Sequence, residues 1–578
     1  MASLADFKPL RPAERRLVDW LQVGNRAPCV LSDGLPSAEA PEEVRLRASL
    51  VSHLARGGCP QCPLPETGLR IFGALIEGDG PPGAETRGLD LDGARLPGDL
   101  AFISCRIPEL VLLRSARVEN LFFNGSALRA GLAADRLHAY GDVVLDEVVT
   151  GAAADPARAR PAPAEGGAGK SGAALFVDRL EARGSIFLDG DTACGEVRLL
   201  GARLGGDLSC TRARFAAGPQ ERAFSADRID VKGDIFLSGA AIDGELRLLG
   251  AQLGGDLNCY GTRMSARGAR WALHAQGARI AGSFVLRGGA SVDGMMNLTR
   301  AEIGAMTDLA CSWPAPGNML LNRCRYGGFT GPGTPITAEA RIDWLSRQDG
   351  SLRGGDFWSQ PWEECARVLR EMGHDSEARA VLIEKERRQR AARRARLRRQ
   401  YLYEDAYWYA VWDRFLGATV RYGRQPLLAL AWLVAPWLMG SLIFGGAVAQ
   451  DAVKPNLPQI QRAQEWVLCG EAVGVPVPTA LSEAPALGRR MPDQSRIECF
   501  HAQPEGATHP RFDAMIYSAD TLLPVVSLEM QSYWIPDDAE TAGSWARAYL
   551  WLHIALGWFL TILAAAGLSG LIRTDNTT

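Results

Sequence analysis

Two cysteines near the N-terminus have the spacing of a redox or metal-binding motif. Cys59 and Cys62 enclose Pro and Gln in a C-x-x-C string, and such pairs cycle between dithiol and disulfide in oxidoreductases. That chemistry needs a thioredoxin-like βαβ frame, whereas a zinc site needs a second Cys or His pair at similar spacing. Neither accompanies the string, so we predict no redox centre and no metal site there.

A glycine-rich stretch imitates two nucleotide-binding motifs. Gly167, Gly169 and Gly172 make a G-x-G-x-x-G, and residues 164–171 make a relaxed phosphate-loop string that ends in Gly-Lys-Ser. Both motifs bind phosphate only between a strand and the N-terminus of a helix. Here a Pro-rich stretch comes before the glycines and a strand-like pattern follows them. We therefore predict no nucleotide cofactor.

The remaining reactive side chains form no recognisable catalytic set. His501 and His509 flank a proline-containing loop, and no carboxylate stands at a spacing that would orient either imidazole. Cys210 and Cys259 occupy one position of an internal repeat, where a small core residue is a simpler interpretation than a metal or redox ladder. The sequence therefore predicts a protein without catalytic, cofactor-binding or metal-binding residues.

Composition narrows the class of protein further. The 578 residues include 63 Lys and Arg and 66 Asp and Glu, for a net charge of −3, which argues against a nucleic-acid binder that is basic throughout. A hydrophobic share of 47% excludes a disordered chain. The mean hydropathy of −0.06 excludes a mostly membrane-embedded one but leaves room for a few spans.

An internal repeat predicts the fold of the first half. Residues 195–210 and 244–259 agree at 13 of 16 positions with an offset of 49. Within each copy apolar and polar residues alternate with period two, which is typical of strands with one buried face. We predict a right-handed β-solenoid of roughly nine coils over 89–305, with strands about 4.8 Å apart. Leu208 and Leu257 should point inward, with Gly206 and Gly255 at the turns before them.

Helices follow the repeat. The stretch 361–390 predicts a helical hairpin, with a first helix over 362–372, a C-cap at Gly373 and a second helix that opens at Asp375. Nine Lys and Arg lie between 385 and 399. A juxtamembrane segment that contacts anionic lipid headgroups explains their position better than nucleic-acid binding does. The Tyr- and Trp-rich stretch that follows predicts an interfacial amphipathic helix.

Two apolar stretches are long enough to cross a bilayer. Residues 427–449 carry no charge, and we expect Pro436 to kink that helix. The second apolar stretch covers 551–572, and we expect His553 to face water near its end. Basic residues gather before the first span, whereas the segment between the spans is acidic. Both termini should therefore be cytoplasmic. The N-terminus shows no secretory signal peptide, which agrees.

The segment between the spans carries two further predictions. Cys469 and Cys499 are its only cysteines, and an oxidising compartment favours a disulfide between them. The apolar stretch 512–538 predicts a re-entrant helix over 512–523, stopped by Pro524. A pore loop is one interpretation, but the potassium-channel filter string is absent. A helix that lies on the extracytoplasmic surface is the alternative.

The chain resembles a family of bacterial membrane proteins with a pentapeptide-like β-solenoid, often named membrane-associated oxidoreductase. The strings that carry the resemblance are PAERRLVDWL at 12–21, GEVRLLGARLGGDL, ALFVDRL, PWEECARVLREMGHDSEARAVLIEKERR and YSADTLLPVVSLEMQSYW. The resemblance implies a bacterial inner-membrane location. It supplies no established reaction, so no catalytic residue is carried over.

These patterns together predict a mainly β solenoid followed by a helical hairpin and a two-helix transmembrane region. The expected parts are a helical and irregular cap (1–70), the solenoid (71–330) with a disordered insert (149–172), the hairpin and basic neck (335–400), the interfacial helix (401–425), the two transmembrane helices (427–449 and 549–572) and the extracytoplasmic segment (451–545). We expect a non-enzymatic scaffold or sensor that holds a protein partner on the solenoid. The alternatives are a homo-oligomeric ion channel or gate with a pore loop near 512–538, and an oxidoreductase.

Overall fold

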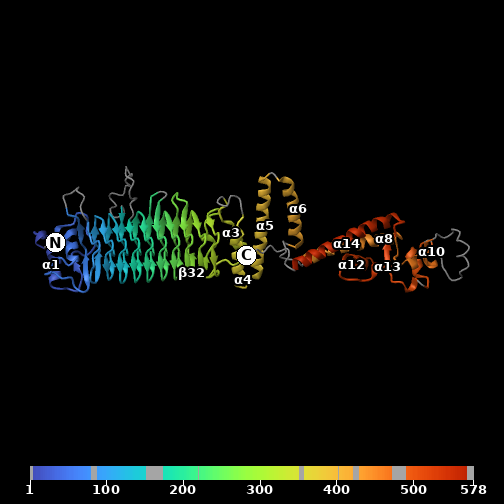
Figure 1. Cartoon of the computed structure of the whole chain (residues 1–578), viewed down its shortest axis with the longest axis horizontal. Coiled ribbons are helices and arrows are strands. Elements are labelled where there is room, and N and C mark those ends of the chain that lie inside the picture. The colour runs from blue at the N-terminus through green and yellow to red at the C-terminus, as the bar shows by residue number, and fades with distance from the viewer. Residues whose placement is uncertain are drawn as a thin grey trace. The chain divides into compact units, whose positions relative to one another are not determined.

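The computed structural model describes residues 4–79, 88–151, 174–218, 221–350, 357–400, 402–420, 428–470, 490–491, 493–504 and 506–568. The chain forms two compact units, Met1–Ala392 and Arg393–Thr578 (Figure 1). Most of the predicted insert 149–172, with its glycine motifs, lies outside the described residues. Val149 and Thr150, which we assigned to the insert, instead form a regular strand of the solenoid, β14 (Val149–Thr150).

The first unit contains the predicted β-solenoid, built from short parallel strands. One face is a ten-stranded sheet from β2 (Arg45–Arg47) to β33 (Ser291–Asp293). A second is a nine-stranded sheet from β7 (Val111–Leu112) to β36 (Met319–Leu320). An eighteen-stranded sheet takes two strands from most coils, such as β20 (Arg203–Leu204) and β21 (Leu208–Ser209).

Strand pairing explains the 49-residue repeat. Leu175 of β15 (Leu175–Phe176) pairs with Val197 of β19 (Val197–Arg198), which pairs in turn with Phe224 of β23 (Arg222–Ser225). These partners are 22 and 27 residues apart, so two coils make one repeat. The longer coil carries its extra residues between β22 (Arg214–Ala216) and β23.

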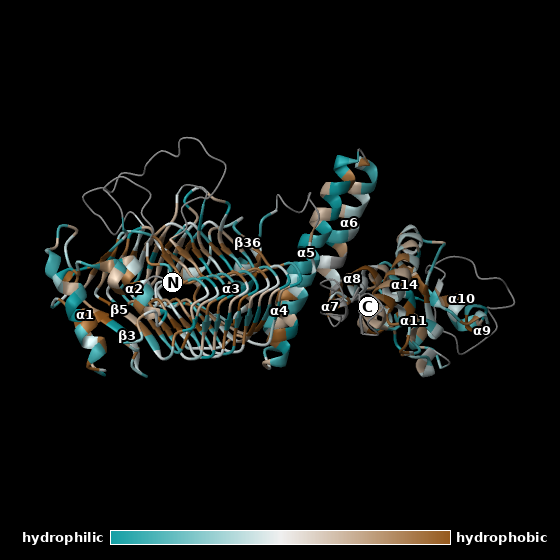
Figure 2. Ribbon diagram, turned by 60° about the vertical axis from the view of Figure 1, so that its left-hand side comes forward, coloured by the Kyte–Doolittle hydropathy of each residue, from teal (hydrophilic) through white to brown (hydrophobic). Residues whose placement is uncertain are grey.

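The interior is a stack of apolar side chains, as predicted. Leu208, Ile235 and Leu257 lie on successive coils in register and are fully buried. Cys210 and Cys259 are also buried, and burial raises the pKa of the Cys259 thiol to about 12. These cysteines are therefore core residues. Each turn of the ribbon alternates hydrophobic and hydrophilic stretches (Figure 2).

The Gly-Asp pairs have a steric role that the sequence did not reveal. Asp207 Oδ1 accepts a hydrogen bond from the Asp234 amide at 2.8 Å, and Asp234 Oδ1 accepts one from the Asp256 amide at 2.5 Å. A Cβ atom at Gly233 would lie 1.9 Å from Asp207 Oδ1, and one at Gly255 would lie 1.9 Å from Asp234 Oδ1. Glycine therefore leaves room for a carboxylate ladder that satisfies backbone amides from coil to coil.

Helices lie at both ends of the solenoid (Figure 1). At the N-terminal end are α1 (Pro12–Gln22) and α2 (Ala48–Ala55), and the expected cap 1–70 also adds strands β1 (Cys29–Val30), β2 and β3 (Gly68–Phe72) to the sheets. At the other end are α3 (Ala338–Ser346) and α4 (Gln360–Glu371). Gly373 then adopts a φ of +84° before α5 (Asp375–Arg399) begins, which confirms the predicted hairpin.

The second unit is largely helical. It contains α6 (Tyr403–Val420), α7 (Leu428–Ala431), α8 (Val434–Ala449), α12 (Ala514–Leu522) and α14 (Thr541–Leu568). Among the described residues one helix, over Thr541–Ala566, is long and apolar enough to cross a membrane. The second expected span, 549–572, falls largely within α14, although α14 begins earlier.

The first expected span is not one helix. The stretch 427–449 contains two helices, α7 and α8, separated at Trp432 and Leu433. We expected the disturbance at Pro436 itself. A proline ring clashes with the carbonyl four residues earlier, which here belongs to Trp432, so the interruption lies one turn before the proline.

His553 is buried, whereas we expected it to face water. It is 1% exposed, and its Nε2 lies 3.0 Å from the Ser518 carbonyl oxygen on α12. A Cβ atom at Gly440 of α8 would lie 2.3 Å from Ser518 Oγ and 2.8 Å from His553 Cε1. The glycine lets α8, α12 and α14 approach closely enough to enclose the imidazole.

Candidate functional site

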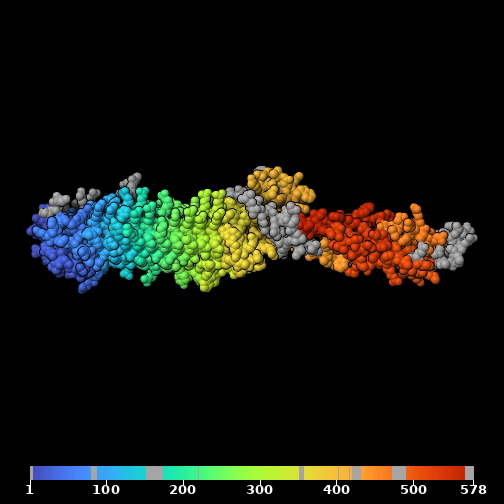
Figure 3. Space-filling model, turned by 60° about the horizontal axis from the view of Figure 1, so that its bottom comes forward, coloured from blue at the N-terminus to red at the C-terminus, as the bar shows by residue number. Residues whose placement is uncertain are grey.

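Three neighbouring hollows on one face of the solenoid form the candidate site. The first lies beside α4 and has a volume of about 640 Å³; we call it the capped groove. The second, of about 540 Å³, lies around His138 and Arg203, and the third, of about 910 Å³, lies around Arg179 and Arg228. All three share Asp230. Because they share this lining residue, the hollows form one extended face, which we call the binding face. The coils that carry it follow one another along the solenoid in the order of the chain (Figure 3).

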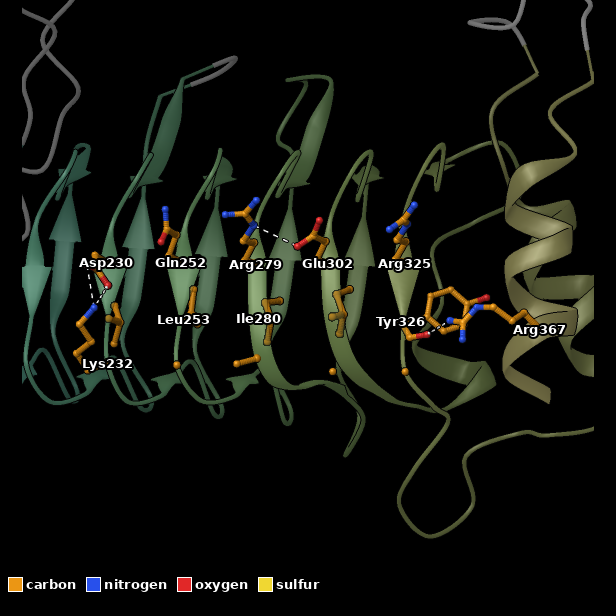
Figure 4. Close-up of a pocket in the computed structure, with 16 residues that line it drawn as sticks. Asp230, Lys232, Gln252, Leu253, Arg279, Ile280, Glu302, Arg325, Tyr326 and Arg367 are labelled. Atoms are coloured by element: carbon orange, nitrogen blue, oxygen red, sulfur yellow. Dashed lines mark hydrogen bonds and ion pairs between the residues drawn. The ribbon is translucent and has the colours of Figure 1, made fainter. Parts of the chain in front are cut away.

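The capped groove is built from equivalent positions on successive coils (Figure 4). The first residues of its strands point outward and form one wall: Gln252 of β28 (Gln252–Leu253), Arg279 of β32 (Arg279–Leu286), Glu302 of β35 (Glu302–Asp308) and Arg325 of β37 (Arg325–Tyr326). Two residues after each of these positions the chain carries a small residue: Gly254, Ala281, Gly304 and Gly327. This column of small residues leaves the floor open.

The small floor residues are also required by the stacking of the coils. A Cβ atom at Gly304 would lie 2.2 Å from the Ala281 carbonyl oxygen, and one at Gly254 would lie 2.1 Å from the Lys232 carbonyl oxygen. Only glycine allows this approach at either position. The open floor of the capped groove is therefore required by the close packing of the coils, whether or not a ligand binds there.

Arg367 of α4 closes one end of the capped groove. Its Nη2 donates a hydrogen bond to the Tyr326 carbonyl oxygen at 2.8 Å and lies 2.7 Å from Glu364 Oε1. Its Nη1 lies 2.5 Å from Glu371 Oε2. These two carboxylates raise the pKa of Arg367, with the hydrogen bond to Glu364 as the largest cause. The guanidinium is thus held in place, and its charge is compensated by α4.

The binding face carries more positive than negative charge. Across the three hollows, 12 Lys and Arg and five Asp and Glu line the surface. Some cations are paired: Arg279 Nε lies 3.1 Å from Glu302 Oε2, and Lys232 Nζ lies 2.9 Å from Asp230 Oδ1. Arg325 is exposed and has no ion pair within the described part of the chain. The excess of seven positive charges contrasts with the net charge of −3 for the whole chain.

The second hollow contains a histidine beside a carboxylate. His138 Nδ1 lies 3.2 Å from Glu181 Oε2, and Arg203 Nη1 lies 3.3 Å from Glu181 Oε1. All three side chains are more than 40% exposed. Exposed pairs of this kind contribute little to stability, so they leave the charges available to a ligand.

The two cysteines of the C-x-x-C string lie next to each other in the first unit. Cys59 Sγ and Cys62 Sγ lie 2.8 Å apart, and both residues are buried. Burial raises the pKa of Cys62 to about 11, which disfavours the reactive thiolate. Within the described ranges no group of three or more His, Cys, Asp or Glu is placed to hold a metal ion.

The two histidines of the second unit come close together. The ring centroids of His501 and His509 are 6.5 Å apart, and both rings pack against Trp534. His501 Nδ1 lies 2.8 Å from the Gly506 carbonyl oxygen. Burial lowers the pKa of His509, and the neighbouring His501 lowers it further. The contacts of both imidazoles are therefore those of an aromatic core.

Cys469 and Cys499 are joined by a disulfide bond, with their Cα atoms 5.7 Å apart. Cys469 belongs to α10 (Gln464–Gly470) and Cys499 to α11 (Arg496–His501). Of the residues between the two helices, 471–489 and 492 lie outside the described part of the chain. The bond ties two short helices that also pack against each other through Trp466 and Phe500, whose ring centroids are 5.4 Å apart.

The basic run 385–399 is partly neutralised within the chain. Lys385 is buried, and its Nζ lies 3.0 Å from Glu363 Oε1. Arg388 Nε lies 2.7 Å from Glu384 Oε1, and Arg394 forms an ion pair with Asp413. Fewer than the nine cations counted in the sequence therefore remain for lipid headgroups.

The sequence does not display the binding face, because its charged residues are far apart along the chain. One polar or charged position recurs once per coil, at residues 181, 203, 230, 252, 279, 302 and 325. This recurrence is the sequence pattern that could have indicated the face. Comparison of the chain with family models, curated proteins and solved structures found no match. The fold therefore defines the class, a parallel β-solenoid joined to an apolar helical unit.

Proposed function

We propose that the protein is a membrane-anchored scaffold that binds a protein partner along the binding face of its solenoid. The observation that carries this proposal is the face itself, on which three contiguous hollows expose charged columns from successive coils. The proposal includes a bacterial inner-membrane location, cytoplasmic termini, and membership of the membrane-associated oxidoreductase family that the sequence resembles. It assigns the chain no reaction.

The rigidity of the solenoid supports a scaffold. Each coil is hydrogen-bonded to both neighbours through parallel strands, and the carboxylate ladder from Asp207 to Asp256 links the turns. A rigid surface loses little conformational freedom on binding, so weak charged contacts add up over several coils. Solenoids with extended binding surfaces commonly use them in this way.

The helical unit supplies the anchor in this proposal. The apolar part of α14, over Thr541–Ala566, would cross the bilayer, and α8 would insert beside it. Several large apolar side chains of α14 are exposed, among them Trp551, Leu552 and Ile562. Such residues are tolerated on the surface of a helix that faces lipid.

One observation favours the channel as a second candidate. α12 packs between α8 and α14, and the chain after it turns back on α12. Asp520 Oδ1 accepts a hydrogen bond from the Leu528 amide at 2.6 Å, and Asp520 Oδ2 accepts one from the Gln531 amide at 2.7 Å. The loop between carries Val525, which is 81% exposed. A loop held in this way after a short buried helix is a candidate pore lining in an oligomer.

The experiment that tests the scaffold is site-specific photo-crosslinking in native membranes. A benzophenone side chain at Gln252 lies in the capped groove, and the same side chain at Arg263 of β30 (Arg263–Ser265) lies on the ten-stranded sheet. We expect a discrete crosslinked product from position 252 only. Ala281→Trp, which fills the exposed floor of the groove, should abolish it. Equal crosslinking from both positions, or none from 252, would contradict the scaffold.

A further inference from the structure

The corner before the binding face contains arginines in an unusual backbone conformation. Among the described residues Arg136, Arg179, Arg228, Arg300 and Arg323 have φ values between 55° and 58°. They occupy one column. Apart from the Arg323 amide, which donates to Gln360 Oε1 of α4, each backbone amide donates a hydrogen bond to the next coil. The Arg179 amide donates to the Leu200 carbonyl oxygen at 2.9 Å, and the Arg228 amide donates to the Leu249 carbonyl oxygen at 2.8 Å.

Other coils have glycine at the same corner position. Gly201, Gly250 and Gly277 belong to the same column, with φ values of 66°, 62° and 69°. Side chains with a Cβ atom are strained in this region, whereas glycine is not. Five coils therefore keep an arginine at a position where glycine would remove the strain. Such strain is commonly found where a residue has a function other than stabilising the fold.

The corner arginines Arg136, Arg179 and Arg228 have no ion-pair partner among the described residues. Arg136, Arg179 and Arg228 are exposed, line the third hollow, and form no ion pair with any residue that the structure describes. Their neighbours differ in this respect: Arg198 Nη2 lies 2.7 Å from Asp178 Oδ2, and Arg114 Nη2 lies 2.5 Å from Asp92 Oδ2. The hollow thus combines paired arginines with unpaired ones on its rim.

We propose that the corner arginines Arg136, Arg179 and Arg228 bind the carboxylates of an acidic segment of the partner protein. This inference rests on the proposed scaffold and names the chemistry of its partner. A guanidinium binds a carboxylate through two parallel hydrogen bonds, so a column of unpaired arginines on a rigid corner fits a row of Asp or Glu side chains.

The acidic residues of the hollow favour a protein over a nucleic acid. Asp135, Asp178, Glu181 and Asp230 line the same hollow as the arginines. Double-stranded DNA presents one negative charge about every 1.7 Å, so its phosphates would meet these carboxylates as well as the arginines. A protein segment can place its carboxylates opposite the arginines and neutral residues opposite the acids.

The probe is a fluorescent poly-L-glutamate of about 20 residues, bound to the full-length protein in detergent and followed by anisotropy. We expect the triple variant Arg136→Gly, Arg179→Gly, Arg228→Gly to weaken binding at least about tenfold, because each charge-assisted contact contributes about that factor. Glycine is native at other coils of this column. The variant should therefore unfold at a temperature no lower than the wild type, which separates lost binding from lost folding.

Arg212 offers a matched control. It has a φ of 59° in another corner column, between Gly190 and Gly239, and it lines none of the three hollows. Arg212→Gly removes the same charge and the same strain, and poly-glutamate binding should stay within about twofold of the wild type. Equal loss in Arg212→Gly and Arg228→Gly would show a general charge effect and overturn the proposal.

Two competing probes complete the test. Absence of poly-glutamate binding to the wild type overturns the proposal. Tighter binding of a 20-base-pair DNA duplex or of phosphatidylglycerol vesicles, lost in the triple variant, reassigns the corner to phosphates and also overturns it. If position 252 still crosslinks to a partner but poly-glutamate does not bind, the arginine proposal is wrong and the scaffold proposal is unaffected. The two proposals can therefore be tested separately.

Discussion

Arg341 and Asp308 form a buried two-point ion pair at the C-terminal end of the solenoid. Arg341 Nη1 lies 2.9 Å from Asp308 Oδ2, and Nη2 lies 2.8 Å from Oδ1. Both residues are at most 1% exposed, and Trp313 Nε1 donates a further hydrogen bond to Oδ2 at 2.6 Å. Because Asp308 ends β35 and Arg341 belongs to α3, the pair joins the last coils to the helices that cover them.

Arg341→Met should destabilise the first unit strongly. The substitution leaves the Asp308 carboxylate buried without its counter-ion, and breaking a buried pair in this way costs about 3–5 kcal/mol. Urea unfolding followed by tryptophan fluorescence measures the loss. Arg279→Met breaks the exposed pair with Glu302 and should cost less than about 1 kcal/mol. Similar losses in the two variants would contradict a structural role for the buried pair.

Leu257→Asp tests the inward stack. The side chain is fully buried between Ile235 and Phe284 on the adjacent coils, so an aspartate there has no partner and should cost several kcal/mol. Asn258→Asp places the same charge on the neighbouring, partly exposed position and should change stability by less than about 1 kcal/mol. Thermal unfolding compares the two. Wild-type stability of Leu257→Asp would show that the stack is wrong.

Asp191 makes the stability of the solenoid depend on pH between its unfolded-state and folded-state pKa values. It is 2% exposed, its Oδ1 accepts a hydrogen bond from the Val148 amide at 2.7 Å, and burial raises its pKa to about 9. In the unfolded chain its pKa is about 3.9, so between these values the folded state binds the extra proton. Stability therefore falls as pH rises through this window, by up to about 1.4 kcal/mol per pH unit.

Asp191→Asn removes this dependence and keeps an acceptor for the Val148 amide. We expect the variant to be more stable than the wild type at pH 8 and nearly equal to it at pH 4.5. Thermal unfolding at the two pH values checks the sign. If the wild type instead became more stable relative to the variant between pH 4.5 and pH 8, the folded protein would not hold Asp191 in its protonated form.

The disulfide between Cys469 and Cys499 can be detected as two linked peptides. Non-reducing mass spectrometry of a protease digest should recover the Cys469 and Cys499 peptides as one species. In the chain-entropy model a loop of this size stabilises by about 3–4 kcal/mol, so reduction should lower the unfolding temperature of the second unit. Cys311, an exposed free thiol, is the alkylation control. Recovery of both cysteines as alkylated thiols would exclude the bond.

Cys311 also reports the orientation in the membrane. Cys29, Cys59 and Cys365 are buried, so their failure to react would say nothing about topology, whereas Cys311 is exposed on the same unit. With a cytoplasmic solenoid, a membrane-impermeant maleimide should label Cys311 only after permeabilisation. Labelling in intact cells would reverse the orientation.

Local patterns were enough to predict the solenoid and the hairpin. Period-two alternation around Leu208 and Leu257 requires strands with one buried face, and the 49-residue offset requires stacked coils. Gly373 and Asp375 mark the end of one helix and the start of the next. These features depend on neighbours along the chain, which the sequence displays directly.

The tertiary structure decided the rest, because it depends on contacts between residues that are far apart in the chain. A coil of 43 residues separates Arg136 from Arg179, and coils of 22 and 27 residues separate Arg179 from Arg228. Strand register brings the three arginines into one column, whereas along the sequence the charges look evenly mixed. His553 is buried because Gly440 of a different helix allows close packing. A chain with a net charge of −3 can therefore carry a strongly basic face. The net charge depends only on composition, whereas the fold decides which charged residues lie together.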